Sequence, residues 1–206
     1  APGAAITNIG NANTADLNLN GTIYTTSGAT TYNSAGTDLG GASPTFTTSN
    51  DAITFGTGNV TIANGTLTVN SVGGLIDFEG SILGTSDEVV VLNANAANDG
   101  DSANEKVIVA AIGTGDHIHQ VGITGRDQIT LEGNITTSNK AGNNVSFTGP
   151  VRLNTGTVAI DTDADANDGT ITFSSTIDSL TSGRNLDLVS ATGNVTVTGA
   201  IGTNLA

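Results

Sequence analysis

Short stretches of alternating apolar and polar residues recur along almost the whole chain and constrain its fold more than any other feature. Each stretch holds two apolar residues separated by one position, and this two-residue period is typical of a β-strand with one buried face. The pairs are Leu17/Leu19, Ile53/Phe55, Val60/Ile62, Leu67/Val69, Ile76/Phe78, Val107/Val109, Ile129/Leu131, Val145/Phe147, Val151/Leu153, Val158/Ile160, Ile171/Phe173, Leu186/Leu188 and Val195/Val197.

The residues between these stretches turn the chain instead of continuing it. Gly, Asn or Asp follows nearly every pair within a few positions, and the chain holds 28 glycines to make tight turns. No stretch has the apolar spacing of an amphipathic helix. The Ala-rich segment 93–103 contains Asn98-Asp99-Gly100 and is predicted to be a loop. We therefore expect an all-β protein with essentially no helix.

The expected strands are shorter than the roughly five to six residues typical of sheets, which favours a parallel β-helix (β-solenoid). A β-sandwich, pilin-like or Ig-like, is the alternative. The solenoid is also favoured by an alignment of residues 53–112 with 145–202, which pairs Phe55 with Phe147 and Phe78 with Phe173. Phenylalanines at matching positions predict ladders of stacked side chains inside the solenoid.

A longer match relates Leu19 to Leu131, 112 residues apart. It predicts a single continuous β-solenoid over residues 1–206, made of two imperfect repeats. One repeat covers about 17–128, and the other covers 129–206 completed by residues 1–16 of a neighbouring unit. A repeat that continues at both ends predicts a head-to-tail array, either fused in one giant chain or stacked as separate subunits.

The charge of the chain excludes one class of partner. The net charge is −14, and all five basic residues (Lys106, Arg126, Lys140, Arg152 and Arg184) follow residue 105. Binding to nucleic acid needs clustered Lys and Arg, so nucleic acid is not expected as a partner. The sequence has no Cys and no apolar run of the roughly 18 residues that a membrane helix needs, so we expect neither disulfides nor membrane insertion.

One acidic segment has the residue types of a calcium loop. Asp161, Asp163, Asp165, Asn167 and Asp168 alternate carboxylates with small residues, and their oxygens could converge on one Ca²⁺. The segment lacks the Gly and the Glu that such a loop carries at its sixth and twelfth positions, so a solvated acidic loop is the alternative. The segment from Asn93 to Glu105 is a weaker calcium candidate, with carboxylates at Asp99, Asp101 and Glu105. No other cofactor is expected.

The sequence offers no catalytic arrangement. His117 and His119 could share one strand face, but nothing nearby supplies the third ligand that zinc requires. The carboxylates fall mostly in expected loops, and neither a Ser–His–Asp arrangement nor a phosphate-binding glycine loop is evident. We therefore expect a protein that is not an enzyme.

Several motifs resemble the tandem repeats of filamentous-haemagglutinin-like adhesins and related giant bacterial surface exoproteins. These motifs are ITLEGNITTSN, VSFTGPVRL, TVAIDTDADANDGTITFSSTIDS and GNVTVTGAIG, within a resemblance that covers roughly residues 16–202. The resemblance implies a right-handed parallel β-helix, secretion to the cell surface, and a role in adhesion or matrix building. It carries over no catalytic residues.

Together these observations predict an acidic, secreted structural unit of an extracellular bacterial filament or surface fibre. Its main expected partner is another copy of itself, through head-to-tail self-assembly. The alternative is a carbohydrate-binding or cell-adhesion module of a surface adhesin, whose loops would bind surface glycans.

Overall fold

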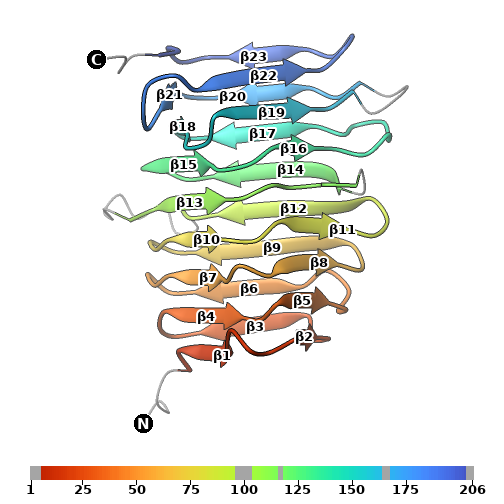
Figure 1. Cartoon of the computed structure of the whole chain (residues 1–206), viewed down its shortest axis with the longest axis vertical. Coiled ribbons are helices and arrows are strands. Elements are labelled where there is room, and N and C mark those ends of the chain that lie inside the picture. Colours follow the sequence, from red (N-terminus) through yellow and green to blue (C-terminus); the bar gives the residue numbers. More distant parts are fainter. Residues whose placement is uncertain (1–5, 96–103, 116–117, 164–167, 203–206) are drawn as a thin grey trace.

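The strands wind into a β-solenoid of eight turns, stacked along the long axis of Figure 1. The computed structural model describes residues 6–95, 104–115, 118–163 and 168–202, and these residues contain no helix. Every strand pairing within them is parallel, because each turn brings the chain back in the same direction one level further along the axis. The expected all-β parallel β-helix is confirmed, and the sandwich alternative is wrong.

Each turn contributes to three sheets that run the length of the molecule. Sheet A consists of β1 (Asn8–Gly10), β4 (Thr30–Asn33), β7 (Ile53–Phe55), β10 (Ile76–Phe78), β13 (Lys106–Val109), β15 (Gln128–Leu131), β18 (Val151–Leu153) and β21 (Ile177–Ser179). Sheet C consists of β3 (Ile23–Thr26), β6 (Thr45–Thr48), β9 (Thr66–Ser71), β12 (Glu88–Asn93), β14 (Ile118–Thr124), β17 (Val145–Thr148), β20 (Ile171–Phe173) and β23 (Val195–Val197).

Sheet B lies between them in each turn and has two parts. Its strands are β2 (Asp16–Leu19), β5 (Gly36–Leu39), β8 (Asn59–Ile62) and β11 (Ile82–Gly84), followed by β16 (Ile135–Thr136), β19 (Thr157–Asp161) and β22 (Asn185–Val189). Ile112 joins the two parts, because it bridges Ile82 on one side and Ile135 on the other. The three sheets therefore enclose one uninterrupted interior.

The apolar residues of the sequence pairs point into this interior. Buried residues alternate with more exposed ones along the strands, and the buried hydrophobic side chains form one continuous cluster along the axis. One inward column of sheet B shows how the cluster is built, since nearly every turn adds one aliphatic side chain to it. From first to last turn this column is Leu17, Thr37, Val60, Ile82, Ile112, Ile135, Ile160 and Leu188.

Stacked aromatic ladders are present, but between different partners from those that the sequence alignment paired. Phe55 stacks on Phe78 in sheet A with ring centroids 4.4 Å apart, and Phe147 stacks on Phe173 in sheet C at 4.7 Å. Each pair lies in adjacent turns of one sheet. The alignment of Phe55 with Phe147 therefore related sheet A to sheet C and was wrong about equivalent positions.

The structural repeat is the single turn. Register partners in successive turns are mostly 22 to 24 residues apart, as with Thr31 and Thr54 or Ile129 and Val151. Leu19 lies in sheet B and Leu131 in sheet A, so the 112-residue spacing is not a whole number of turns. The sheets continue without a break past residues 128 and 129.

Candidate functional site

The exposed large hydrophobic residues are concentrated at the two ends of the solenoid, and Val195 and Ile201 occupy positions that the preceding turn buries as Ile171 and Ile177. All six large hydrophobic residues that are exposed in the described part of the chain lie in or beside the first or last turn: Ile6, Ile23, Leu180, Val189, Val195 and Ile201. Among the described strands, β2 pairs only with β5 and β22 only with β19, so these end strands have free edges. Unpaired edges of this kind are templates for pairing with another chain.

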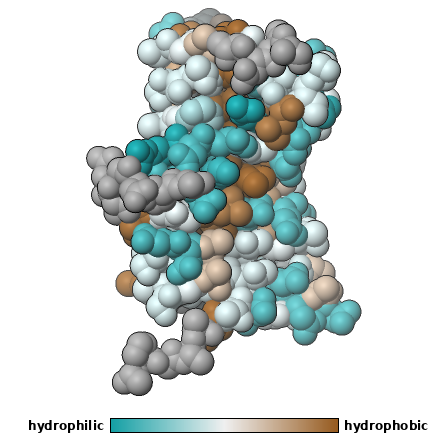
Figure 2. All heavy atoms as spheres, turned by 90° about the vertical axis from the view of Figure 1, so that its left-hand side faces the viewer, coloured by the Kyte–Doolittle hydropathy of each residue, from teal (hydrophilic) through white to brown (hydrophobic). Residues whose placement is uncertain are grey.

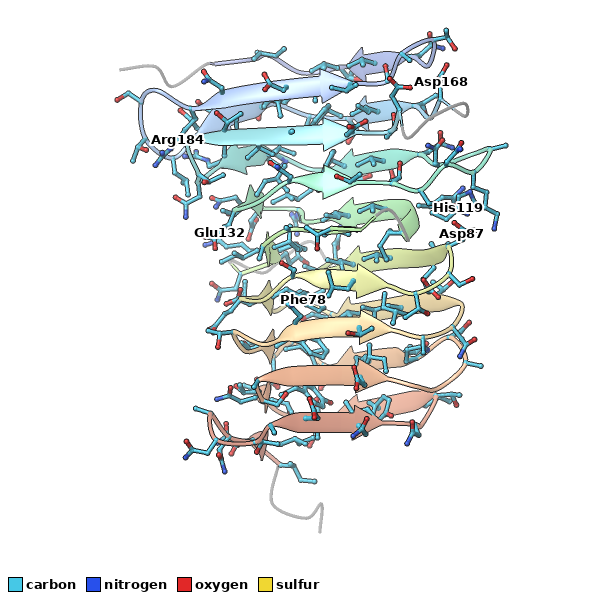
Figure 3. All side chains as sticks on the ribbon, turned by 45° about the vertical axis from the view of Figure 1, so that its right-hand side comes forward. Phe78, Asp87, His119, Glu132, Asp168 and Arg184 are labelled. Atoms are coloured by element: carbon cyan, nitrogen blue, oxygen red, sulfur yellow. The ribbon has the colours of Figure 1, made fainter. Side chains whose placement is uncertain are left out.

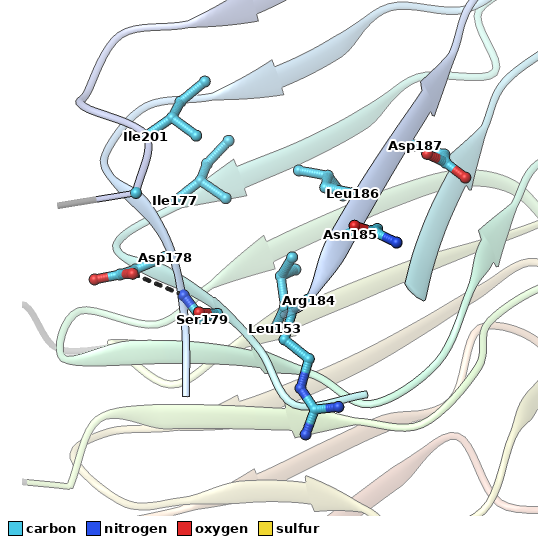
Figure 4. Close-up of a pocket in the computed structure, with 10 residues that line it drawn as sticks. Leu153, Ile177, Asp178, Ser179, Arg184, Asn185, Leu186, Asp187 and Ile201 are labelled. Atoms are coloured by element: carbon cyan, nitrogen blue, oxygen red, sulfur yellow. Dashed lines mark hydrogen bonds between the residues drawn. The ribbon is translucent and has the colours of Figure 1, made fainter. Parts of the chain in front are cut away.

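A pocket of about 400 Å³ opens at the carboxyl-terminal end, between sheets A and B (Figure 4). Its apolar wall comes from Leu153, Ile177, Leu186 and Ile201. On its rim, Arg184 has a buried Nε atom that finds no hydrogen-bond partner in the structure. The pocket marks the place where the stack of turns stops and the interior is left open.

Sheet A carries a group of carboxylates on its outer side. Figure 2 faces this side, where hydrophilic and hydrophobic residues are interspersed. Asp77 lies on β10, and Glu79 and Glu132 follow β10 and β15. Partial burial, and then the negative charges of Glu79 and Glu132, raise the pKa of Asp77 from 3.8 to about 6. Glu132 also accepts a hydrogen bond from the side-chain amide of Asn154 at 2.7 Å.

Replacing Asp77 with asparagine is therefore expected to stabilise the protein at neutral pH. Between about pH 4 and 6 the folded chain binds this proton more tightly than the unfolded chain does, so stability falls as pH rises through that window. Because Asp77 is half-exposed, the gain at pH 7 should be only about 1 kcal/mol. Thermal melts at pH 7.5 and pH 3.5 would test this, with Asp38→Asn on sheet B as the matched control. A gain at pH 3.5 equal to that at pH 7.5 would contradict the assignment.

The residues of the predicted calcium loop are only partly described. The backbone N–H of Asp163 donates to Asp161 at 2.9 Å. Hydrogen bonds from the Thr192 hydroxyl and from its backbone N–H, the latter at 3.0 Å, lower the pKa of Asp168, and Asp163 contributes in the same direction. Asp165 and Asn167 lie outside the described residues. The structure thus places Asp163 near Asp168, and calcium binding here stays a prediction.

The second acidic loop leaves the solenoid at a different corner. It connects sheet C to sheet A, whereas the segment between Asp161 and Asp168 connects sheet B to sheet C. Glu105 is fully buried at its end and forms an ion pair with Arg126 at 3.4 Å. Asp99 and Asp101 lie outside the described residues, so this candidate is not tested either.

Figure 3 shows Asp87, His119 and Asp168 along one edge of the molecule, where sheet B turns into sheet C. His119 approaches the carbonyl oxygen of Ala141 in the next turn, with Nε2 at 3.2 Å. In the same region Lys140 lies 3.9 Å from Asp87. His117 lies outside the described residues. The contacts of His119 link neighbouring turns.

Within the described ranges, no three His, Cys, Asp or Glu side chains are grouped so that they could hold a metal ion. No described helix is long and apolar enough to cross a membrane.

Fold and ends together define a β-solenoid protein with two open, partly apolar ends. No protein-family model, curated protein or solved structure matches the chain.

Proposed function

We propose that this chain is a structural repeat unit or subunit of an extracellular bacterial filament or surface fibre, which assembles head to tail. The observation that carries the proposal is the confinement of the exposed large hydrophobic residues to the two ends of the described solenoid. The likeness of its motifs to the repeats of giant surface adhesins supports a location outside the cell.

The ends have the geometry that a continued stack requires. In each sheet, the inward residues of the last turn would meet the inward residues of the first turn of the next copy. In sheet B this places Leu188 against Leu17, at the two ends of one inward column. In sheet C it places Val197 against Tyr24. These four residues are only partly buried in the single chain and already pack against the core.

Stacking would also satisfy the backbone groups at the edges. The free sides of β1, β2 and β3 would pair with the segment around Ile201 and with β22 and β23. Apolar side chains of the first turn, such as Ile9, would help to fill the open pocket beside Ile177 and Ile201. Such a contact joins two different surfaces, and therefore it propagates into a filament instead of closing into a dimer.

The alternative, a glycan-binding module, has less support from the residues. Carbohydrate sites commonly present aromatic side chains, whose apolar faces stack on sugar rings. Here all seven aromatic side chains are buried in the core or pack against it. The outer faces of the solenoid therefore carry no aromatic platform.

Substituting Ile201 with lysine tests the assembly proposal. Sedimentation velocity should show wild-type species that grow with protein concentration, because each added copy buries an apolar end. Ile201→Lys places a charge in that contact and should keep the chain monomeric. Ile201 is 67% exposed, so its replacement should leave the fold intact.

The matched control is Ile108→Lys, the same change on the outer side of sheet A in the middle of the molecule. This control should assemble as the wild type does. A wild-type chain that stays monomeric at the highest attainable concentration would contradict the proposal, as would equal assembly of wild type and Ile201→Lys.

A further inference from the structure

The outer side of sheet C is a regular array of small hydroxyl-bearing residues. Two outward positions in each turn, on the sheet C strand or directly after it, form two columns that run along the axis. We name these sixteen residues the sheet C face: Ile23, Thr45, Thr68, Val91, Gly122, Ser146, Thr172 and Thr196 in one column, and Thr25, Thr47, Asn70, Asn93, Thr124, Thr148, Ser174 and Thr198 in the other. Nine of the sixteen are threonines.

The array is ordered in two directions by the solenoid itself. Neighbouring strands of a sheet lie about 4.7–4.9 Å apart, and alternate residues of one strand lie roughly 6.6 Å apart. The strands of sheet C run across the long axis and stack one above another along it (Figure 1). The threonine side chains are held at these spacings because the residues between them, such as Phe46 and Phe147, are buried.

The threonine hydroxyls of this face are free to bind an external lattice, whereas the hydroxyl of Ser174 donates to the carbonyl oxygen of Phe147 at 3.1 Å. None of the nine threonine hydroxyls donates or accepts a hydrogen bond within the described structure. Beside Thr25 and Thr47 lies a depression that Ser27 and Ser49 also line.

The sheet C face also lacks charge, in a chain whose net charge is −14. Sheet A carries Asp77 and Arg152 on its outer side, and sheet B carries Asp38 and Asp187. Among the sheet C strands the only Asp, Glu, Lys or Arg is Glu88, which is buried. The acidic charge of the protein is thus kept on the other two sheets and the loops.

We propose that the sheet C face binds ordered water at the surface of ice. Each threonine presents a methyl group, around which first-shell water is restricted, and a hydroxyl that both donates and accepts hydrogen bonds. The sheet repeats these groups at two fixed spacings, so many of them can contact a periodic surface at once. Charged side chains hold their own hydration water, so an uncharged face is what such a contact requires.

Val91 and Gly122 interrupt the hydroxyls in the middle of the face. The array therefore consists of a first part on β3, β6 and β9 and a second part on β14, β17, β20 and β23. Each part offers threonines on at least three strands. Many weak contacts act together on a crystal surface, so both parts contribute to adsorption.

The test is thermal hysteresis and uptake of the protein into a growing ice hemisphere. Wild-type protein should lower the freezing point below the melting point and should enter the ice. Thr47→Lys and Thr148→Lys, one in each part of the face, should each lose most of both effects. The matched controls Thr54→Lys on sheet A and Thr61→Lys on sheet B add the same charge elsewhere and should behave as the wild type.

Two results would overturn the proposal. One is a wild-type protein without hysteresis and without uptake into ice. The other is equal loss in the sheet C variants and the controls, which would assign the effect to net charge instead of to this face. Binding of the wild type to crystalline cellulose or chitin with no effect on ice would identify a polysaccharide surface as the ligand. None of these outcomes depends on head-to-tail assembly.

Discussion

Replacing Phe78 with alanine is expected to destabilise the protein by about 3–5 kcal/mol, because a buried aromatic ring is lost and a cavity remains. Phe78 is fully buried, points into the interior between the sheets (Figure 3), and stacks on Phe55 at an interplanar angle of 10°. A solenoid turn contacts only its neighbours, so the loss concentrates on the third, fourth and fifth turns. Urea unfolding followed by circular dichroism measures the effect.

Phe78→Leu is the matched control for this cavity. Leucine keeps the position apolar and fills part of the space, so the loss should be clearly smaller than with alanine. A loss below about 1 kcal/mol for Phe78→Ala would contradict the continuous packed interior, since burying such a side chain alone is worth more than that.

Replacing Glu88 with alanine is expected to cost about 2–4 kcal/mol, because it removes hydrogen bonds to a charged acceptor inside the fold. Glu88 is 1% exposed and closes the turn before β12. Its Oε2 accepts the backbone N–H groups of Thr85 and Ser86, both at 2.8 Å, and its Oε1 accepts the Thr85 hydroxyl at 3.2 Å. Without the carboxylate, two backbone donors lose their partners.

Glu88→Gln separates the hydrogen bonds from the space that the side chain fills. Glutamine keeps one acceptor oxygen and nearly the same volume, so it should retain part of the stability. Chemical denaturation of both variants gives the comparison. Equal losses for alanine and glutamine would show that the negative charge of Glu88, and not the presence of an acceptor, holds this turn.

The alternation of apolar residues predicted the strands well where both inward positions are apolar. Every such pair, from Leu17/Leu19 to Val195/Val197, lies in an observed strand at inward positions, although Val195 stays exposed at the open end. β12 and β14 also carry apolar inward pairs, Val90/Leu92 and Val121/Ile123, whereas β4, β5 and β6 were not predicted. In β4, β5 and β6 the inward positions include Thr30, Thr37 and Thr48, whose polar side chains conceal the period.

The sequence alone did not predict which strands share a sheet. Phe55 and Phe147 follow similar apolar patterns, but the pattern of a strand does not depend on which side of the solenoid it occupies. Corners also differ in length, since Ile76 and Val107 are register partners 31 residues apart. The alignment of the two halves therefore matched strands of sheet A with strands of sheet C.

The sheet C face was missed for the same reason. Thr47 and Thr148 stand next to buried phenylalanines in similar sequence contexts, and nothing local shows that they share one flat surface. The head-to-tail hypothesis came from the 112-residue match, which relates sheet B to sheet A, and it stays a prediction. The exposed Val195 and Ile201, at inward positions of the last turn, now give that hypothesis specific contact residues.

Electron microscopy of the protein under assembling conditions tests the central claim, head-to-tail stacking, most directly. Eight turns at roughly 4.8 Å per turn predict filaments with a subunit repeat of about 38 Å along the axis. Their strands should lie across the filament axis and pair continuously from one copy to the next. Isolated particles about 38 Å long at every concentration, with both ends free, would contradict the account.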